Sequence, residues 1–276
     1  CTASGNTGSR SYRVFKKIFY MSLKGFTIKN HVYIPERVNP DSCFEKKYID
    51  LRWLEKRMYG DEEVLHLPAI SNEHPHYREW RLRQQSCCRL INYLQKKRQP
   101  LKILEVGCGN GWLSHQLSRM PGAEVIGADV NFTELQQAGR VFNTAPGLQF
   151  IYGDIRSEVF EHMQFDSIVF AASIQYFPSL TEIISNTIKL LKHQGEIHIL
   201  DSHFYNQDTS VSAKKRTKEY YNHLGFPEMA DHYFHHCLSD LKAFNFKILY
   251  KPFWGGNFFS HNNNPFIWVC IKKNIY

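Results

Sequence analysis

Several common sequence patterns are missing from this chain, and each absence excludes a class of protein. No apolar run approaches the ~20 residues that a membrane-spanning helix needs. The seven cysteines form no C-x-x-C pair, and the adjacent Cys87 and Cys88 suit neither a zinc knuckle nor a disulfide framework. No glycine loop ends in the Gly-Lys-Ser/Thr of a phosphate-binding P-loop. We therefore expect free thiols in a reducing compartment and no membrane span.

The composition is otherwise that of a globular protein with many aromatic side chains. The 276 residues suffice for one large domain or for a domain with an extension. The aromatic content of 14% fits a pocket for an apolar substrate or simply a thick core. The net charge of +8 permits an anionic partner, but the basic residues are scattered. The densest cluster, at 214–218, fits the solvated face of a helix, so we do not expect nucleic acid as a partner.

One glycine-rich stretch organises the chain. An apolar run starting at Leu101 leads into Gly107, Gly109 and Gly111, and helical spacing resumes after them. This pattern predicts a strand, a tight turn and a helix N-terminus, where backbone N–H groups and the helix dipole favour a bound cofactor. A dinucleotide fold would need its third glycine where Trp112 stands. The stretch is therefore a cofactor loop of another type, unless it is an ordinary glycine turn.

The motif Glu105-x-Gly107-x-Gly109-x-Gly111 resembles motif I of the class I S-adenosylmethionine-dependent methyltransferases. In that family the loop wraps the methionine part of the cofactor. The strand at 124–129 ends on Asp129, about twenty positions past the glycines, where a carboxylate can accept both ribose hydroxyls. The alternative is that Asp129 caps the next helix, although Asn131 is also available as the cap.

Later segments extend the resemblance over about residues 85–276. The family places the Asp of a Gly-Asp-apolar motif on the adenine amino group and the apolar side chain on the ring, and Asp154 and Ile155 match it. The alternative for Asp154 is a helix cap at 157–162. The fourth strand, 165–177, exits without the Asn/Asp-Pro-Pro-aromatic motif of amino methyltransferases. Its absence argues against adenine, cytosine or a glutamine amide as the acceptor.

The C-terminal third completes the expected sheet. Residues 195–201 resemble the family's fifth strand, and 246–253 and 265–272 are expected to form an antiparallel pair with a turn at Trp254. An Asn-Pro-Phe sequence at 264–266 is expected to lie far from the cofactor face. The resemblance implies an α/β, doubly wound, mostly parallel seven-stranded sheet in the order 3-2-1-4-5-7-6, the Rossmann-like methyltransferase fold.

We expect two regions, an N-terminal helical extension or cap at 1–98 and the cofactor-binding methyltransferase domain at 99–276. Residues 1–40 predict loose structure with one short helix at 12–23. Helical spacing predicts helices at 42–58, with a Ser42/Glu45 capping box, and at 75–97. The second of these helices carries the candidate lid residues Tyr77, Trp80, Arg81 and Arg83. One of the two arginines can pair with the cofactor carboxylate. The alternative is a core tryptophan beside solvated arginines.

The resemblance implies S-adenosyl-L-methionine as the cofactor. The residues expected to bind it are Glu105, Gly107, Cys108, Gly109, Gly111, Asp129, Val130, Asp154, Ile155 and Ala171. Methyl transfer needs positioning and often a base, and the exits of strands four and five face the methyl group. The catalytic candidates are therefore Tyr176, His203 and Tyr205, with His203 as the general base.

A histidine-rich segment at 231–237 is the other candidate site. Asp231, His232 and His235 have a spacing that can place metal ligands on one helix face. The H-E-x-x-H motif is not met, because Tyr233 stands where the glutamate belongs. We expect these side chains to line a pocket or the surface, and we expect no metal.

The sequence thus predicts a cytoplasmic methyltransferase that acts on oxygen or nitrogen of a small or medium organic acceptor. Two alternatives remain, a methyltransferase of RNA or protein and a non-catalytic member of the fold that binds the cofactor. The chain opens on Cys1 and a polar stretch, as a mature lipoprotein does, but the cytosolic origin of the cofactor favours a fragment or an artificial start. Met21 is a candidate natural start. The sequence does not predict the oligomeric state.

Overall fold

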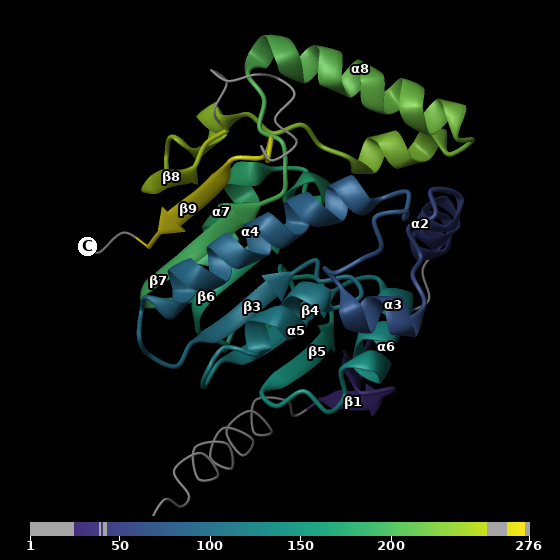
Figure 1. Ribbon diagram of the computed structural model, residues 1–276. Helices are drawn as coiled ribbons and strands as arrows, with labels where there is room; N and C mark the ends of the chain where they lie inside the picture. Colours follow the sequence, from purple (N-terminus) through teal and green to yellow (C-terminus); the bar gives the residue numbers. More distant parts are fainter. Residues whose placement is uncertain (1–24, 39, 41–42, 253–263, 274–276) are drawn as a thin grey trace, which may run out of the picture.

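A single mixed sheet runs through the part of the chain that the computed structural model describes, residues 25–38, 40, 43–252 and 264–273 (Figure 1). Its nine strands follow the spatial order β1-β2-β5-β4-β3-β6-β7-β9-β8. The strands are β1 (Phe26–Lys29), β2 (Val32–Pro35), β3 (Lys102–Val106), β4 (Glu124–Asp129), β5 (Leu148–Tyr152), β6 (Phe165–Ala171), β7 (Leu191–Leu200), β8 (Phe246–Tyr250) and β9 (Trp268–Lys272).

Helices cover both faces of this sheet. The α-helices are α2 (Cys43–Leu54), α3 (Asp61–His66), α4 (Tyr77–Gln95), α5 (Trp112–Ser118), α6 (Phe132–Val141), α7 (Leu180–Lys189) and α8 (Gln207–His223). The 3-10 helices are η1 (Glu158–Phe160), η2 (Ile174–Tyr176), η3 (Pro227–His232) and η4 (Leu238–Leu241). Figure 1 shows α4 and α5 in front of the sheet and α7 behind it. Accordingly, one core cluster contains Leu90 of α4 and Leu117 of α5, and a second contains Ile184 of α7.

The predicted seven-stranded arrangement is confirmed in β3 to β9. Numbered along the chain, these strands have the order 3-2-1-4-5-7-6, and β9 pairs antiparallel with both β7 and β8. The central strand β3 pairs parallel with β4 on one side and with β6 on the other. The chain therefore winds outward in both directions from β3. At such a switch point, the loops after the carboxyl ends separate and leave a crevice for a ligand.

The N-terminal segment differs from the prediction of loose structure. Residues 26–35 form a hairpin, and its second strand joins the sheet parallel to β5, with Val32 opposite Phe150. Val32 and Ile34 point into the core, with 0% and 5% of their surfaces exposed. Asn30 and His31 form the turn, both with positive φ, as a tight hairpin requires. The extension is thus not wholly helical, and the predicted helix at 12–23 lies outside the described residues.

The helices ahead of β3 are shorter than predicted. The first, α2, ends at Leu54, and Gly60 is the N-cap of α3 instead of ending a helix at 58. Ser42 lies outside the described residues, so the predicted capping box is not described. The Glu45 carboxylate instead accepts hydrogen bonds from the backbone N–H and hydroxyl of Thr133, at 2.8 and 2.9 Å. This contact ties α2 to the beginning of α6, beside the end of β4.

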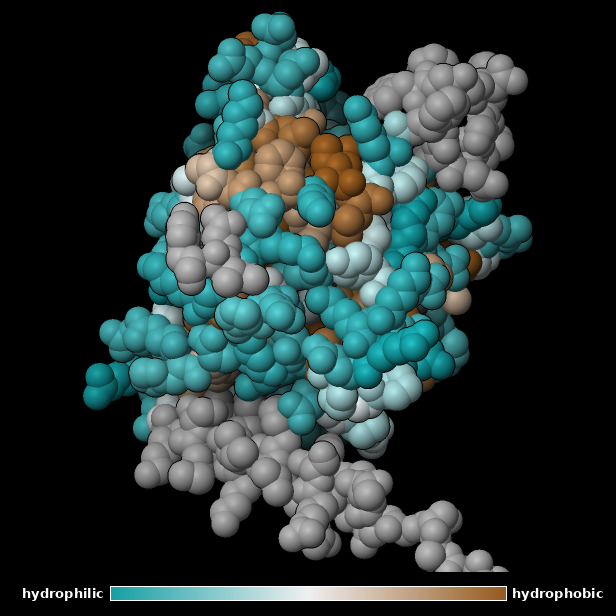
Figure 2. Space-filling view, turned by 90° about the vertical axis from the view of Figure 1, so that its left-hand side faces the viewer, coloured by the Kyte–Doolittle hydropathy of each residue, from teal (hydrophilic) through white to brown (hydrophobic). Residues whose placement is uncertain are grey.

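The sheet ends at β8, which exposes apolar side chains. Ile248 and Leu249 of this edge strand are each 37% exposed. Figure 2 shows an apolar area on the side of the molecule on which β8 lies. The turn predicted at Trp254 lies outside the described residues.

Candidate active site

A cavity of about 920 Å³ opens at the carboxyl ends of the central strands. The loops after β3, β4, β5, β6 and β7 form its floor, and side chains of α2, α4 and α8 cover it. Segments far apart in the sequence thus meet at the switch point of the sheet. The floor segments are 105–110, 128–131, 153–156, 171–177 and 201–203.

The glycine loop forms one wall of the cavity. Gly107 and Gly109 line it, with φ of 74° and 52°. A Cβ at Gly107 would lie 2.5 Å from the Cβ of Ser173, so the loop approaches the exit of β6 closely. Both positions therefore favour glycine, by conformation and, at Gly107, by space.

Gly111, predicted as a cofactor contact, lies outside the cavity lining. Its φ is 75°, and a Cβ would lie 2.6 Å from the ring of Phe150 and 2.8 Å from the Cβ of Ala138. This glycine lets the first turn of α5 pack against β5 and α6. The sequence alone does not distinguish a glycine that makes room for a ligand from one that lets a helix pack closely, which is why Gly111 was predicted as a cofactor contact.

Asp129 ends β4 and faces the glycine loop. Its Oδ2 accepts a hydrogen bond from the N–H of Gly109 at 2.7 Å, and its Oδ1 accepts one from the N–H of Asn131 at 2.8 Å. The cap of α6 is Asn131, whose side chain accepts from the N–H of Glu134 at 3.1 Å. Asp129 is therefore not the cap of α6. It lines the cavity together with the half-exposed Val130.

Asp154 and Ile155 lie at the exit of β5, on the same cavity. Ile155 is buried, whereas the Asp154 carboxylate is held by the guanidinium of Arg156, whose Nε lies 2.9 Å from Oδ1. Burial alone would raise the pKa of Asp154, but the hydrogen bonds from Arg156 leave it lowered. The carboxylate is therefore charged, and Arg156 shares it with any ligand that approaches.

Three carboxyl groups are buried around the cofactor end of the cavity. Burial raises the pKa of Glu105 to about 8, of Glu134 to about 7 and of Asp201 to about 6. The hydroxyls of Ser114 and Ser86 donate to Glu105 and Asp201 respectively. Only Glu105 was predicted. In the sequence, Glu134 looks like any acidic residue in the first turn of a helix, so nothing marks it as part of a site. Asp201 directly follows β7 and lies two positions before His203, so its position could have identified it as a site residue.

Two of the three catalytic candidates lie at the cavity and the third does not. Tyr176 and His203 line the cavity, whereas Tyr205 does not. The backbone N–H of Tyr205 donates to the carbonyl of His236 at 2.9 Å, as part of an isolated β-bridge to Cys237. Burial and the nearby Arg216 lower the pKa of His203. Its imidazole is thus neutral near pH 7, the form that a base requires.

The Asn264-Pro265-Phe266 segment lies at the cavity, which corrects the prediction that it is remote. The ring of Phe266 lines the cavity, and its centroid is 4.6 Å from that of His203. Asn264 is buried, and its side-chain amide donates to the hydroxyl of Ser86 on α4 at 2.8 Å. The chain ahead of β9 therefore returns across the end of the sheet, a path that sequence spacing does not encode.

The predicted lid residues of α4 divide between core and cavity. Trp80 is only 4% exposed, and its indole N–H donates to the hydroxyl of Tyr59 at 2.9 Å. Arg83 lines the cavity and pairs with Glu79 at 2.8 Å. Tyr77 and Arg81 are not part of the lining. Trp80 is thus a core residue at the cavity wall, and Arg83 is the arginine that reaches the site.

The histidine-rich segment does not gather its side chains into one group. His235 Nε2 lies 2.9 Å from the hydroxyl of Thr217, and His236 Nε2 lies 3.1 Å from the carbonyl oxygen of Ile174. η3 ends at His232, so the predicted helix face is not formed. These histidines fix α8 and η2 to the segment that follows η3.

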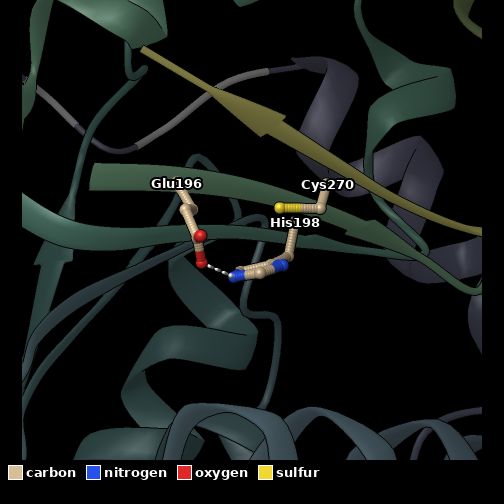
Figure 3. A group of neighbouring side chains, drawn as sticks. All are labelled: Glu196, His198 and Cys270. Carbon is tan, nitrogen blue, oxygen red and sulfur yellow. Dashed lines mark ion pairs between the residues drawn. The ribbon is translucent and has the colours of Figure 1, made fainter. Parts of the chain in front are cut away.

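A different cluster has ligand-type side chains, Glu196, His198 and Cys270, which meet between β7 and β9 (Figure 3). Within the described residues it is the one group of three with ligand atoms within 4.8 Å of one another. Lys97 and Lys272 already neutralise Glu196, at 2.8 and 3.2 Å.

The hydrogen bonds of this cluster also disfavour a metal. The Trp268 indole N–H donates to His198 Nδ1 at 3.3 Å. A metal-bound histidine instead donates its second N–H to an acceptor. The cluster is therefore better described as a buried polar network in which Lys97 and Lys272 pair with Glu196. Burial lowers the pKa of His198 to about 4, so its imidazole is neutral near pH 7.

Two expectations drawn from missing patterns are tested by the described residues. None of their helices is long and apolar enough to cross a membrane. The cysteines whose side chains the structure describes are free thiols, namely Cys87, Cys88, Cys108, Cys237 and Cys270. Cys108 is buried in the glycine loop, where burial raises the pKa of its thiol.

Comparison with known proteins decides the family. Residues 103–195, from β3 into β7, match the family described as a methyltransferase domain. This part of the chain thus belongs to the methyltransferase-domain family, and the chain is similar to the class I S-adenosylmethionine-dependent methyltransferases. The chain is 34% identical over 116 residues to a malonyl-[acyl-carrier protein] O-methyltransferase of Halalkalibacterium halodurans, covering 39% of this chain and 43% of the relative.

Two further proteins support this assignment. A ubiquinone biosynthesis O-methyltransferase of Proteus mirabilis is 30% identical over 113 residues, which are 39% of this chain and 45% of the relative. The chain thus spans less than half of these curated relatives. The crystal structure of magnesium protoporphyrin IX methyltransferase from Synechocystis PCC 6803 shares the fold, with a TM-score of 0.52, 18% identity and coverage of 84% of this chain and 96% of that chain.

Proposed function

We propose that this methyltransferase transfers a methyl group from S-adenosyl-L-methionine to oxygen or nitrogen of a small or medium organic acceptor. The observation that carries the proposal is a single cavity with two chemically different ends. Gly107, Gly109 and Asp129 form a polar end with exposed loop backbone, whereas Tyr233 and Phe266 belong to an aromatic end. The volume of about 920 Å³ falls within the range of small-molecule and cofactor sites.

The polar end has a partner for each part of the cofactor. The glycine loop would enclose the methionine part, and Arg83 would pair with its carboxylate. Asp129 would accept the ribose hydroxyls, using the lone pairs that Gly109 and Asn131 leave free. Asp154 would accept the adenine amino group while Ile155 packs against the ring.

Methyl transfer is an in-line displacement at the sulfonium carbon, so the protein mainly positions donor and acceptor. The neutral imidazole of His203 would accept the proton of the attacking oxygen or nitrogen. Burial raises the pKa of the Tyr176 hydroxyl, which therefore stays protonated and can donate a hydrogen bond to the acceptor. His203 is exposed at the cavity rim, which gives the proton a path to solvent.

Two alternative functions remain, methylation of RNA or protein and cofactor binding without catalysis. The aromatic end favours a small acceptor, because planar side chains enclose planar or apolar molecules. By their names, the curated relatives include methyltransferases of a carrier-bound acid, of ubiquinone biosynthesis and of sterols. The cytoplasmic location stays a prediction.

The test is to supply S-adenosylmethionine labelled in its methyl group with separate pools of phenols, organic acids, amines, RNA and protein. We expect label in one of the small-molecule pools. Label only in RNA, with a yield that falls steeply with salt, would support the nucleic-acid alternative instead. Tight binding of S-adenosylhomocysteine without label in any pool would favour the non-catalytic alternative.

A further inference from the structure

The arginines of the cavity are not equivalent. Five line it, namely Arg52, Arg57, Arg83, Arg156 and Arg216. Arg57 and Arg83 share Glu79, and Arg156 is paired with Asp154. The guanidinium of Arg52 lies 3.9 Å from the Glu55 carboxylate, which is a long distance for an ion pair. Arg216 makes no ion pair or hydrogen bond with any described residue, so its five donors are available to a ligand.

Arg216 lies at the aromatic end of the cavity, beyond the loops that are expected to hold the cofactor. It projects from α8, which Figure 1 shows at the top of the view, set apart from the sheet. Burial and then the charge of Arg216 lower the pKa of His203. Burial, Lys214 and His236 lower the pKa of His235 more than Arg216 does. The charge of Lys214 acts on His235 as well, and Lys214 also lacks a carboxylate partner among the described residues. This corner of the cavity is therefore positive and not neutralised.

The walls beside this corner are flat and apolar. The rings of Tyr176 and Tyr233 meet edge to face, with centroids 6.0 Å apart, and Tyr221 lies 6.5 Å from Tyr233. Phe266 lies against His203 on another side. Burial raises the pKa of the Tyr176, Tyr221 and Tyr233 hydroxyls, so none of them adds negative charge near pH 7.

Building on the proposed function, we infer that the methyl acceptor is an anion, with an aromatic or other planar body between these rings and a carboxylate or phosphate bound by Arg216. A guanidinium forms paired hydrogen bonds with both kinds of anion, and it is the residue suited to such recognition. The hydrogen bond between Thr217 and His235 holds α8 against the segment after η3, which keeps the neighbouring Arg216 at the rim.

The test uses the full chain loaded with S-adenosylhomocysteine and a library of small aromatic compounds. Each carboxylate is matched with its neutral amide, and each phosphate ester with the parent alcohol. Binding is measured to the wild type, Arg216→Gln, Arg216→Lys and the control Lys215→Gln. Lys215 neighbours Arg216 in sequence, but its side chain is 79% exposed, pairs with Glu219 and does not line the cavity.

We expect the anionic members to bind about tenfold or more tightly than their neutral partners, since hydrogen bonds to charged groups are the strong ones. Arg216→Gln should abolish this preference, Arg216→Lys should restore part of it, and Lys215→Gln should retain it. The carboxylate and phosphate arms identify which anion is bound. If no anionic member binds better than its partner, or if Arg216→Gln keeps the preference, the inference is wrong. Failure of S-adenosylhomocysteine to bind at all would instead refute the proposed function.

Discussion

The backbone N–H of Gly109 donates a hydrogen bond to the Asp129 carboxylate over 2.7 Å, joining the glycine loop to the end of the neighbouring strand. The two residues lie at the exits of β3 and β4, which pair in parallel. Because the carboxylate is already oriented by this bond and by the N–H of Asn131, a ligand can bind it without first ordering it.

Replacing Asp129 should affect the cofactor more than the fold. Asp129→Ala removes the acceptor of the ribose hydroxyls, and we expect affinity for S-adenosylhomocysteine to fall by about 10–100-fold. Asp129→Asn should be milder, because one acceptor oxygen remains. Calorimetric titration of each variant measures the effect.

The control is Ser179→Ala, which removes the cap of α7 and lies outside the cavity lining. It should lower the free energy of unfolding by about 0.5–2 kcal/mol while leaving cofactor affinity within about twofold of wild type. If Asp129→Ala instead lowers stability by this amount and keeps its affinity, the ribose role is wrong.

Arg83→Ala should weaken binding of the amino-acid part of the cofactor alone. We expect S-adenosylhomocysteine to bind about 10–100-fold more weakly, because a charge-assisted pair with its carboxylate is lost. 5′-Methylthioadenosine lacks that carboxylate and should bind wild type and variant equally. Glu79 keeps its partner Arg57 at 2.7 Å, which limits structural damage. Arg81→Ala, outside the cavity lining, is the matched control, and an equal loss with both ligands would contradict the assignment.

His203→Ala should reduce turnover of the identified acceptor by ~10²–10⁴-fold without changing cofactor affinity. Because burial and Arg216 lower the pKa of His203, the base stays deprotonated at lower pH than usual, and the acid limb of kcat should lie below about pH 6.5. Tyr205→Phe, outside the lining, should be near wild type. A wild-type rate in His203→Ala would reject the base.

The buried Glu105 predicts how the stability of the cofactor-free protein depends on pH. Burial raises its pKa to about 8, against about 4.3 in an unfolded chain, so the folded state holds this proton more tightly. Its contribution to stability is present below pH ~4.3 and is lost as the pH rises through about 8. Glu105→Gln should therefore flatten the decline in the free energy of unfolding between pH 5 and 8. Urea denaturation at both values measures it, and parallel curves for the two proteins would contradict the prediction.

The sequence predicted the features that short-range patterns encode. Apolar runs, glycine turns and the carboxylate at the end of β4 identified one wall of the cavity and carried the family resemblance, which implied the order of β3 to β9. The hairpin at 26–35 was missed because two four-residue strands carry little periodic signal, although Asn30 and His31 formed a recognisable turn. Phe266 was misplaced because its position depends on the buried contact of Asn264 with α4, which pairs residues 178 positions apart. Arg216 likewise reaches the cavity only through the placement of α8.

The most direct test of the central claim is a pair of calorimetric titrations of the purified chain, with S-adenosylhomocysteine and with NAD. The glycine loop has Trp112 where a dinucleotide fold needs glycine, and Asp129 at the end of the next strand. We predict saturable binding of S-adenosylhomocysteine, weakened in Asp129→Ala, and no heat of binding from NAD. Binding of NAD without a response to S-adenosylhomocysteine would contradict the account.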